Sequence, residues 1–207
     1  MATIGLSKPF FAIYTNEGAT VSYSDGGVLG KYTQLDVSLN GGGANVFYAD
    51  NAPAESDDQF SGGTVTITTD DLRPAAMLSA LGVIREAITA TGVTTEGAAW
   101  LVNNDNQQIP YIGLGGIAKK KVDGVVYYVA LVLDKVQLHN LSNSITTQGE
   151  TITWQTSQLT GDIYRSDKAT HDWRRISTFL SSEAEAETAI KAYLNITGDV
   201  PPAGNGD

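Results

Sequence analysis

The strongest structural signal in the sequence is a long β-hairpin near its centre. Two apolar-rich runs, Ile109 to Lys121 and Val125 to His139, flank the turn Val122-Asp123-Gly124. An Asp-Gly pair readily adopts the positive φ angles of a tight hairpin turn, so this pattern predicts two long antiparallel strands. The chain also has 22 glycines and only six prolines, which indicates many turns. The sequence therefore predicts a mainly β fold, a β-sandwich or β-barrel.

Shorter runs with apolar residues at alternate positions predict further strands. These runs are Phe10 to Tyr14, Ala19 to Ser24, Leu35 to Leu39, Val46 to Tyr48, Thr64 to Thr69 and Thr151 to Arg165. The turn Asn16-Glu17-Gly18 predicts that the first two pair, and Gly41-Gly42-Gly43 predicts that the next two pair. Because Val65 and Ile67 alternate with threonines, one face of that strand is expected to be buried.

Two helices are predicted beside the strands. The flanking helix, over about 70–82, starts at Asp70-Asp71, whose carboxylates suit a helix N-terminus, and has Pro74 in its first turn. A continuation of this helix to Thr89 is left open. The C-terminal helix is expected over Ser181 to Asn195, with a serine cap and glutamates in its N-terminal half.

Composition indicates one ordered domain over residues 1–207, with a β-rich core over 1–165 and a C-terminal extension over 166–207. The formal net charge of −10 opposes binding to nucleic-acid phosphates. The chain has no cysteine, which excludes disulfides and thiolate metal sites. It shows neither a signal-peptide pattern nor an apolar run of about 18 residues, so we expect assembly in a cytoplasm and no membrane contact.

Residues typical of enzyme chemistry are few. His139 and His171 stand apart, without the spacing of a zinc site or a nucleophile motif, and are interpreted as surface histidines. Gly113-Leu114-Gly115-Gly116 lacks the ending of a phosphate loop and indicates close strand packing or a bulge. Lys119-Lys120-Lys121, at the tip of the hairpin, is expected to be a solvated turn, to protect a strand edge or to meet an acidic patch on a neighbour. We predict no catalytic residue, cofactor or metal ligand, and no enzyme activity.

Carboxylates gather between Asp50 and Asp71, a stretch that has no lysine or arginine. Their spacing fits neither a calcium loop nor a defined glycosidase pair. A solvated acidic loop is the simplest interpretation. The segment Ala49 to Gly63 is nevertheless long for a simple connection, and such loops are usually functional or are ordered by a partner.

Two blocks of sequence, in the same order, resemble the major tail protein family of long-tailed bacteriophages, which forms the tail tube. The first block comprises Met1 to Leu6, Phe47 to Asn51, Ala54-Glu55, Phe60 to Ile67 and Asp70 to Leu72. The second comprises Pro110 to Gly113, Ala118 to Lys120, Tyr127-Tyr128, Leu131-Val132, Lys135-Val136, Thr151 to Thr156 and Leu159 to Gly161. The similarity covers most of residues 1–165 and weakens beyond Arg165.

The resemblance implies a tail-tube-like fold and a structural virion protein, located in the tail, that self-assembles into stacked hexameric rings. It also implies that long hairpin strands join across the ring to line the lumen, that DNA passes through without specific binding, and that a central loop contacts neighbouring subunits. Implied partners are further copies of the chain, the tape-measure protein, the tail terminator and baseplate proteins. On this chain the interface loop comprises Tyr48, Asp50, Asn51, Pro53, Glu55, Asp57, Asp58 and Phe60.

Two other functions are compatible with the residues. An extracellular β-sandwich module for adhesion or carbohydrate binding is suggested by the aromatics Trp100, Trp154 and Trp173, if these are exposed. An enzyme would rest on the acidic cluster alone. The strands favour assembly over both, because ring closure removes open strand edges that are a liability in a monomer.

Overall fold

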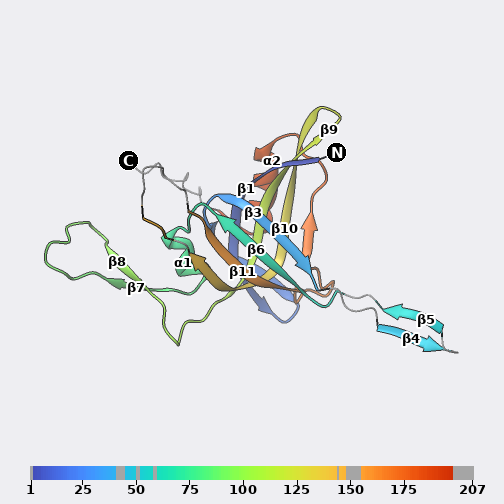
Figure 1. Cartoon of the computed structure of the whole chain (residues 1–207), viewed down its shortest axis with the longest axis horizontal. Helices are drawn as coiled ribbons and strands as arrows, with labels where there is room; N and C mark the ends of the chain where they lie inside the picture. Colours follow the sequence, from blue (N-terminus) through green and yellow to red (C-terminus); the bar gives the residue numbers. More distant parts are fainter. Residues whose placement is uncertain are drawn as a thin grey trace.

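The computed structural model describes residues 2–40, 45–49, 52–57, 60–143, 145–147 and 155–197, with the backbone alone for 45–49, 52–57 and 140. Its strands are β1 (Ala2–Glu17), β2 (Thr20–Val28), β3 (Tyr32–Leu39), β4 (Asn45–Ala49), β5 (Ala52–Asp57), β6 (Gly63–Thr69), β7 (Ile84–Ala87), β8 (Ala99–Val102), β9 (Tyr111–Val122), β10 (Val125–Asn143), β11 (Ser157–Tyr164) and β12 (Arg174–Ile176). The helices are α1 (Pro74–Ala80) and α2 (Glu183–Tyr193) (Figure 1). The fold is mainly β with two helices, as the sequence predicts.

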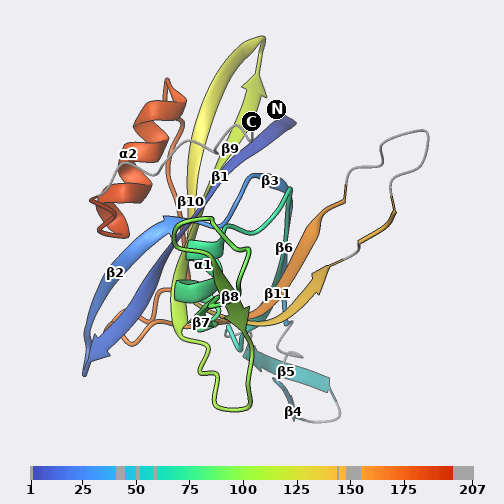
Figure 2. The ribbon, with the colours of Figure 1, turned by 90° about the vertical axis from the view of Figure 1, so that its left-hand side faces the viewer.

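One eight-stranded sheet forms the body of the described chain. Its strands are antiparallel and follow the order β2-β1-β9-β10-β11-β6-β3, with β12 pairing beside β10. The sheet curves so that its two halves face each other with α1 between them, while α2 lies on the outer face (Figure 2). The curvature thus gives each helix its own side of the sheet.

Each side of the sheet has its own hydrophobic core. The inner core is formed by α1 and the inward side chains of the curved sheet, among them Ile67, Ala76, Leu133 and Leu159. The outer core lies between α2 and strands β1, β2, β9 and β10, and includes Ile190. Because burial of apolar surface drives folding, these two layers hold the helices against the two faces of the sheet.

The central hairpin is confirmed as β9 and β10. Asp123 and Gly124 form its turn with φ angles of 50° and 87°, in the left-handed region that a tight turn requires. The first hairpin is confirmed as β1 and β2, with Gly18 at φ 60° in the turn. The burial of Val65 and not of its threonine neighbours in β6 is also confirmed.

The prediction that Leu35 to Leu39 pairs with Val46 to Tyr48 is wrong. The first of these runs lies in β3, which pairs with β6, whereas β4 pairs with β5. The observed register places Leu35 opposite Ile67, and this pairing continues the apolar surface of the inner core. Burial therefore selects the more distant partner over the one that is nearer in sequence.

The flanking helix is shorter than predicted, and its acidic start is wrong. Pro74 sets the first helical position, and Arg73 before it is extended, as residues before proline prefer. Asp70 and Asp71 therefore precede the helix. The carboxylate of Asp70 accepts hydrogen bonds from the backbone N–H groups of Lys31 and Asp71, and that of Asp71 accepts one from Leu72. A continuation to Thr89 does not occur, because Gly82 at φ 63° ends the helix and strand β7 follows.

Other predictions are confirmed in part. Helix α2 has Ser182 as its N-cap, whose side chain accepts a hydrogen bond from the Glu185 N–H at 3.2 Å. The strand expected over Thr151 to Arg165 is observed only as β11, and residues 151–154 lie outside the described part of the chain. In the described residues, no helix is long and apolar enough to cross a membrane.

Candidate subunit interface

The segment predicted as an interface loop is largely a two-stranded hairpin, so the interpretation of Ala49 to Gly63 as an irregular loop is wrong. Tyr48 lies opposite Pro53, and Glu55 and Asp57 lie on the same hairpin. Asp50, Asn51 and Asp58 fall outside the described residues. Strands β4 and β5 pair with each other and not with the large sheet. Because an isolated two-stranded hairpin is marginally stable in water, a further contact surface would stabilise it.

Phe60, the last residue of the predicted interface, lies apart from this hairpin and against the body of the protein. Its ring stacks on Trp173 with centroids 4.6 Å apart and an interplanar angle of 2°. The guanidinium of Arg174 lies 4.5 Å from the centroid of Trp173. The expectation of an exposed Trp173 is therefore wrong, and Phe60 serves to attach the C-terminal extension to the β core.

A second isolated hairpin, formed by β7 and β8, was not predicted. It carries exposed apolar side chains, including Trp100 at 61% exposure and Ile84 at 45%. The hairpins β7–β8 and β4–β5 extend on opposite sides of the body (Figure 1). Exposed apolar groups on such arms are typical of surfaces that contact another protein.

The tip of the β9–β10 hairpin projects beyond the body of the sheet (Figure 2). Its β9 edge is covered by β1, which places Ala2 opposite Lys121 and Gly5 opposite Lys119. The ammonium of Lys119 lies 6.0 Å from the ring centroid of Tyr128. The edge of β9 is thus protected by strand pairing, and the lysines give this end of the molecule a positive charge.

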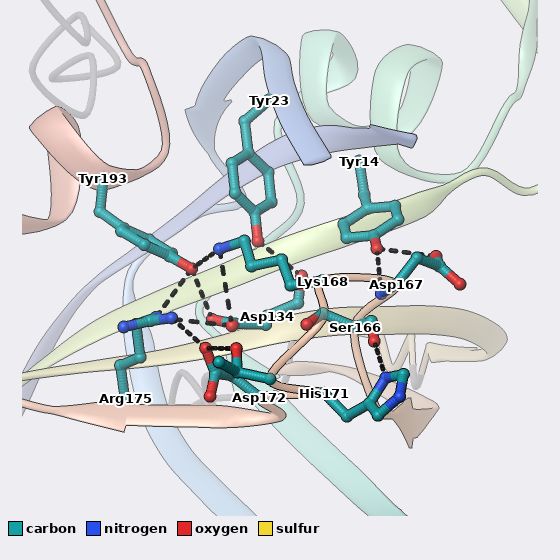
Figure 3. A network of polar contacts seen from close by, with 11 residues as sticks. Tyr14, Tyr23, Asp134, Ser166, Asp167, Lys168, His171, Asp172, Arg175 and Tyr193 are labelled. Atoms are coloured by element: carbon teal, nitrogen blue, oxygen red, sulfur yellow. Dashed lines mark hydrogen bonds and ion pairs between the residues drawn. The ribbon is translucent and has the colours of Figure 1, made fainter. Parts of the chain in front are cut away.

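A polar network joins the C-terminal extension to the sheet (Figure 3). At its centre Asp134 of β10 is fully buried, and its Oδ1 accepts a hydrogen bond from the Tyr193 hydroxyl at 3.1 Å. Its Oδ2 lies 3.5 Å from Nε of Arg175 and 4.0 Å from Nζ of Lys168. The Tyr23 hydroxyl donates to the main-chain oxygen of Asp134 at 2.9 Å. Strands β2, β10 and β12, helix α2 and the connecting segment thus meet at one residue, Asp134.

A second carboxylate extends the network on its exposed side. Asp167 accepts hydrogen bonds from the Tyr14 hydroxyl at 2.8 Å and from Lys135 at 2.7 Å. Arg175 also pairs with Asp172. These contacts hold residues 165–175 against β1 and β10.

The environment changes the titration of several of these groups. Desolvation raises the pKa of Asp134 even though Lys168 and Arg175 attract its charge. Burial raises the pKa of Tyr14 to about 12. Hydrogen bonds from Lys135 and Tyr14 lower the pKa of Asp167. The buried carboxylate is therefore incompletely compensated, whereas the exposed one is well paired.

We interpret the network as structural and not catalytic, because its central carboxylate is inaccessible and its partners come from elements that it holds together. One feature of the sequence indicated this network: Asp134 interrupts an otherwise apolar strand. Its partners could not be found from local pattern, since Arg175 and Tyr193 follow much later in the chain. Removing one partner of a buried ion pair destabilises the fold, because it leaves the other charge buried without compensation.

The remaining candidate residues do not converge on a site. His139 lies 3.5 Å from Asp162, and His171 lies 3.2 Å from the main-chain oxygen of Ser166. Within the described residues, no group of three or more His, Asp or Glu side chains could hold a metal ion. The close packing predicted at the glycine run is confirmed, because a Cβ on Gly113 would lie 2.6 Å from side-chain atoms of Leu194 and Tyr23.

Replacing Asp134 by asparagine is expected to change the pH dependence of stability. Because the pKa of Asp134 is higher in the folded chain than in the unfolded chain, the folded state binds this proton more tightly. The resulting stability is complete below about pH 4 and is lost as the pH rises through the raised pKa. Urea unfolding of wild type and Asp134→Asn between pH 4 and pH 8 should therefore show wild type losing stability relative to the variant as the pH rises.

The difference between the two proteins isolates this group, because the opposite contributions of Asp167 and Glu187, whose pKa values are lowered, occur in both. A difference that stays constant over the whole pH range would contradict the raised pKa.

Comparison of the chain with models of protein families finds no match, and comparison with curated proteins finds none either. Functional inference therefore depends on the ordered sequence blocks and on the surfaces described above.

Proposed function

We propose that this chain is the major tail-tube subunit of a long-tailed bacteriophage, a structural protein that self-assembles into stacked hexameric rings through which DNA is ejected. The observation that carries the proposal is the order of the two sequence blocks over residues 1–165, from the Met1 to Leu6 start to Leu159 to Gly161. In the virion the subunit would contact further copies, the tape-measure protein, the tail terminator and baseplate proteins.

The exposed elements of the fold support self-assembly. Strands β2 and β3 end the described sheet with unpaired edges, and the hairpins β4–β5 and β7–β8 lie outside it. Hairpins on opposite sides of a subunit favour a head-to-tail contact, in which each copy offers one surface and receives a different one. Repetition of such a contact by rotation closes a ring, which protects the edges of every copy.

The charge of the chain supports a role as a DNA conduit. A net charge of −10 per subunit is multiplied in a ring, and like charge keeps phosphates from adhering to the wall of a channel. Since salt screens such repulsion beyond roughly 8–10 Å, it acts only close to the wall.

Negative-stain electron microscopy of concentrated protein tests the proposal directly. We expect rings and tubes with sixfold symmetry, together with a shift from monomer to large species in size-exclusion chromatography with light scattering. Persistent monomers across a range of salt concentrations, with and without seeds of preformed assemblies, would contradict self-assembly.

A carbohydrate-binding or adhesion module is the second candidate, and one observation favours it: Trp100 is 61% exposed on β8. A sugar platform usually needs more than one exposed ring, and Trp173 is stacked on Phe60. Binding of the stable monomer to a glycan array, lost on Trp100→Ala, would favour this function over the tail tube.

A further inference from the structure

The outer edge of β10 is shared by two different partners. On this side β11 pairs with the second half of the strand, from Lys135 to Asn143. The first half would be an open edge if residues 174–180 did not run along it. We call residues 174–180 the strap. Its first part is β12, which places Ile176 opposite Leu131, and its end bridges to Tyr128 through Leu180.

The strap is held by an incomplete ladder of hydrogen bonds. The N–H of Ser177 donates to the oxygen of Ala130 at 2.9 Å, but the N–H of Ala130 donates to the Ser177 side chain in place of a main-chain oxygen. Beyond this point a reciprocal pair of bonds joins Tyr128 and Leu180, at 3.0 and 2.9 Å. β12 itself has three residues, against twelve in β9 on the other side of β10.

Leu180 at the end of the strap packs against the outer core, but the other apolar side chains of the strap are largely exposed. Ile176 is 54% exposed and Phe179 is 47% exposed, although Phe179 stacks on Tyr127 with centroids 5.2 Å apart. In the described part of the chain, β12 pairs with β10 alone, so its outer edge has no strand beside it. Segments with few buried apolar contacts open locally at low free-energy cost.

The base of the strap lies over Asp134. The N–H of Asp134 donates to the oxygen of Trp173, and Arg175 of the strap is one of the cations beside the carboxylate. The other charged or titratable groups around it are Lys168, Tyr23, Tyr193 and Asp172. Closure of the strap therefore places the guanidinium of Arg175 beside this buried carboxylate. Desolvation of Asp134 offsets part of the attraction between this carboxylate and Arg175, so the ion pair holds the strap less firmly than an exposed pair of the same charges would suggest.

We propose that the edge of β10 over residues 128–133 is a strand-pairing surface for a second copy of this chain, and that the strap occupies it in the free subunit. The inference rests on the proposed self-assembly. A second copy fits this edge because every copy also carries unpaired edges at β2 and β3 in the described sheet. An open edge of one copy can pair with the edge that the strap vacates in the next, and repetition gives a head-to-tail series.

A disulfide that fastens the strap tests the inference. Since the hydrogen bonds join residues 130 with 177 and 134 with 173, Leu131 and Ile176 form a non-hydrogen-bonded pair, whose short Cα separation suits a disulfide. The wild-type chain has no cysteine, so the double variant Leu131→Cys, Ile176→Cys forms one defined bond. We expect the reduced variant to assemble like wild type and the oxidised variant to remain monomeric, with at least a tenfold loss of sedimentable assemblies.

The matched control is Thr68→Cys with Gln158→Cys, a directly opposed pair on β6 and β11, two strands inside the sheet that offer no open edge. This disulfide leaves the strap free, so assembly should be the same in both redox states. If the oxidised strap variant assembles as fast as the reduced variant, with the bond verified by mass spectrometry, the inference about the strap is overturned while the proposed function stands. Failure of the unmodified chain to assemble would instead overturn the proposed function and, with it, the partner named here.

Amide hydrogen exchange in the free subunit gives a readout that does not require assembly. The amides of Tyr128, Ser177 and Leu180 bond across the strap, and we expect them to exchange at least tenfold faster than the amides that pair β9 with β10. Oxidation of the strap variant should slow them. Equal protection of the strap and of the β9–β10 ladder would overturn the inference, because the strap would then open only when the whole sheet does.

Discussion

Replacing Ile67 by aspartate is expected to unfold the protein. Ile67 is fully buried in β6, and its neighbours across the two adjacent strands are Leu35 and Leu159. An unpaired carboxylate at this place costs about 3–5 kcal/mol or more, which is a large part of a typical stability of about 5–15 kcal/mol. Loss of the cooperative thermal transition in circular dichroism would report this result.

Thr68→Asp is the matched control, because it introduces the same charge one position along the same strand. Thr68 points to the opposite face and lies between Gln34 and Gln158, so it should lose no more than about 1 kcal/mol. Equal destabilisation by both variants would contradict the assignment of one buried face to β6.

Local sequence signals predicted the parts of the fold in which neighbours in sequence are neighbours in space. The hairpin β9–β10 follows from Asp123-Gly124, and the start of α2 follows from Ser182 with acidic residues behind it. In both cases the residues that determine the local structure lie within one short stretch of the chain. The predicted start of α1 was wrong because two helix-start signals, Asp70-Asp71 and Pro74, stand close together. The helix begins at Pro74, after the acidic pair.

The pairing of distant strands could not be predicted in this way. β3 has an alternating pattern that fits any strand with one buried face, and its choice of β6 depends on the shared inner core. The hairpin β7–β8 gave no periodic signal, because every residue of β7 is exposed and β8 is half-buried at Ala99, Leu101 and Val102 without a strict alternation. Tertiary burial, and not local pattern, decides both cases.

The candidate interface shows the same division. Sequence reasoning selected Tyr48, Glu55 and Asp57, which do lie on one hairpin, but it grouped them with Phe60, which packs on Trp173. The Asp134 network was missed, since its groups are contributed by five separate segments. A buried charge in an apolar strand was the only available sign.

Removal of the β4–β5 hairpin is expected to abolish assembly and to leave the domain folded. The N–H of Asn40 donates to the oxygen of Gly62 at 3.1 Å, so the chain on either side of the hairpin is already joined. Replacing residues 45–57 by a short Gly/Ser turn should therefore change the thermal midpoint little, because β4 and β5 pair with no strand of the sheet. Under the proposed function the same variant should form no tubes in negative-stain images.

The control keeps the segment 45–57 and removes its charge, with Asp50→Asn, Glu55→Gln and Asp57→Asn. If the hairpin joins subunits through its backbone and apolar groups, the variant without the charges should still assemble. If the contact is purely electrostatic, neither this variant nor the deletion variant should assemble, and assembly of wild type should depend strongly on salt. Tubes of normal length and symmetry from the deletion variant would contradict a role of this hairpin in the contact between subunits. Loss of the folded state in that variant would show that β4 and β5 stabilise the domain itself, against the expectation from their separate pairing.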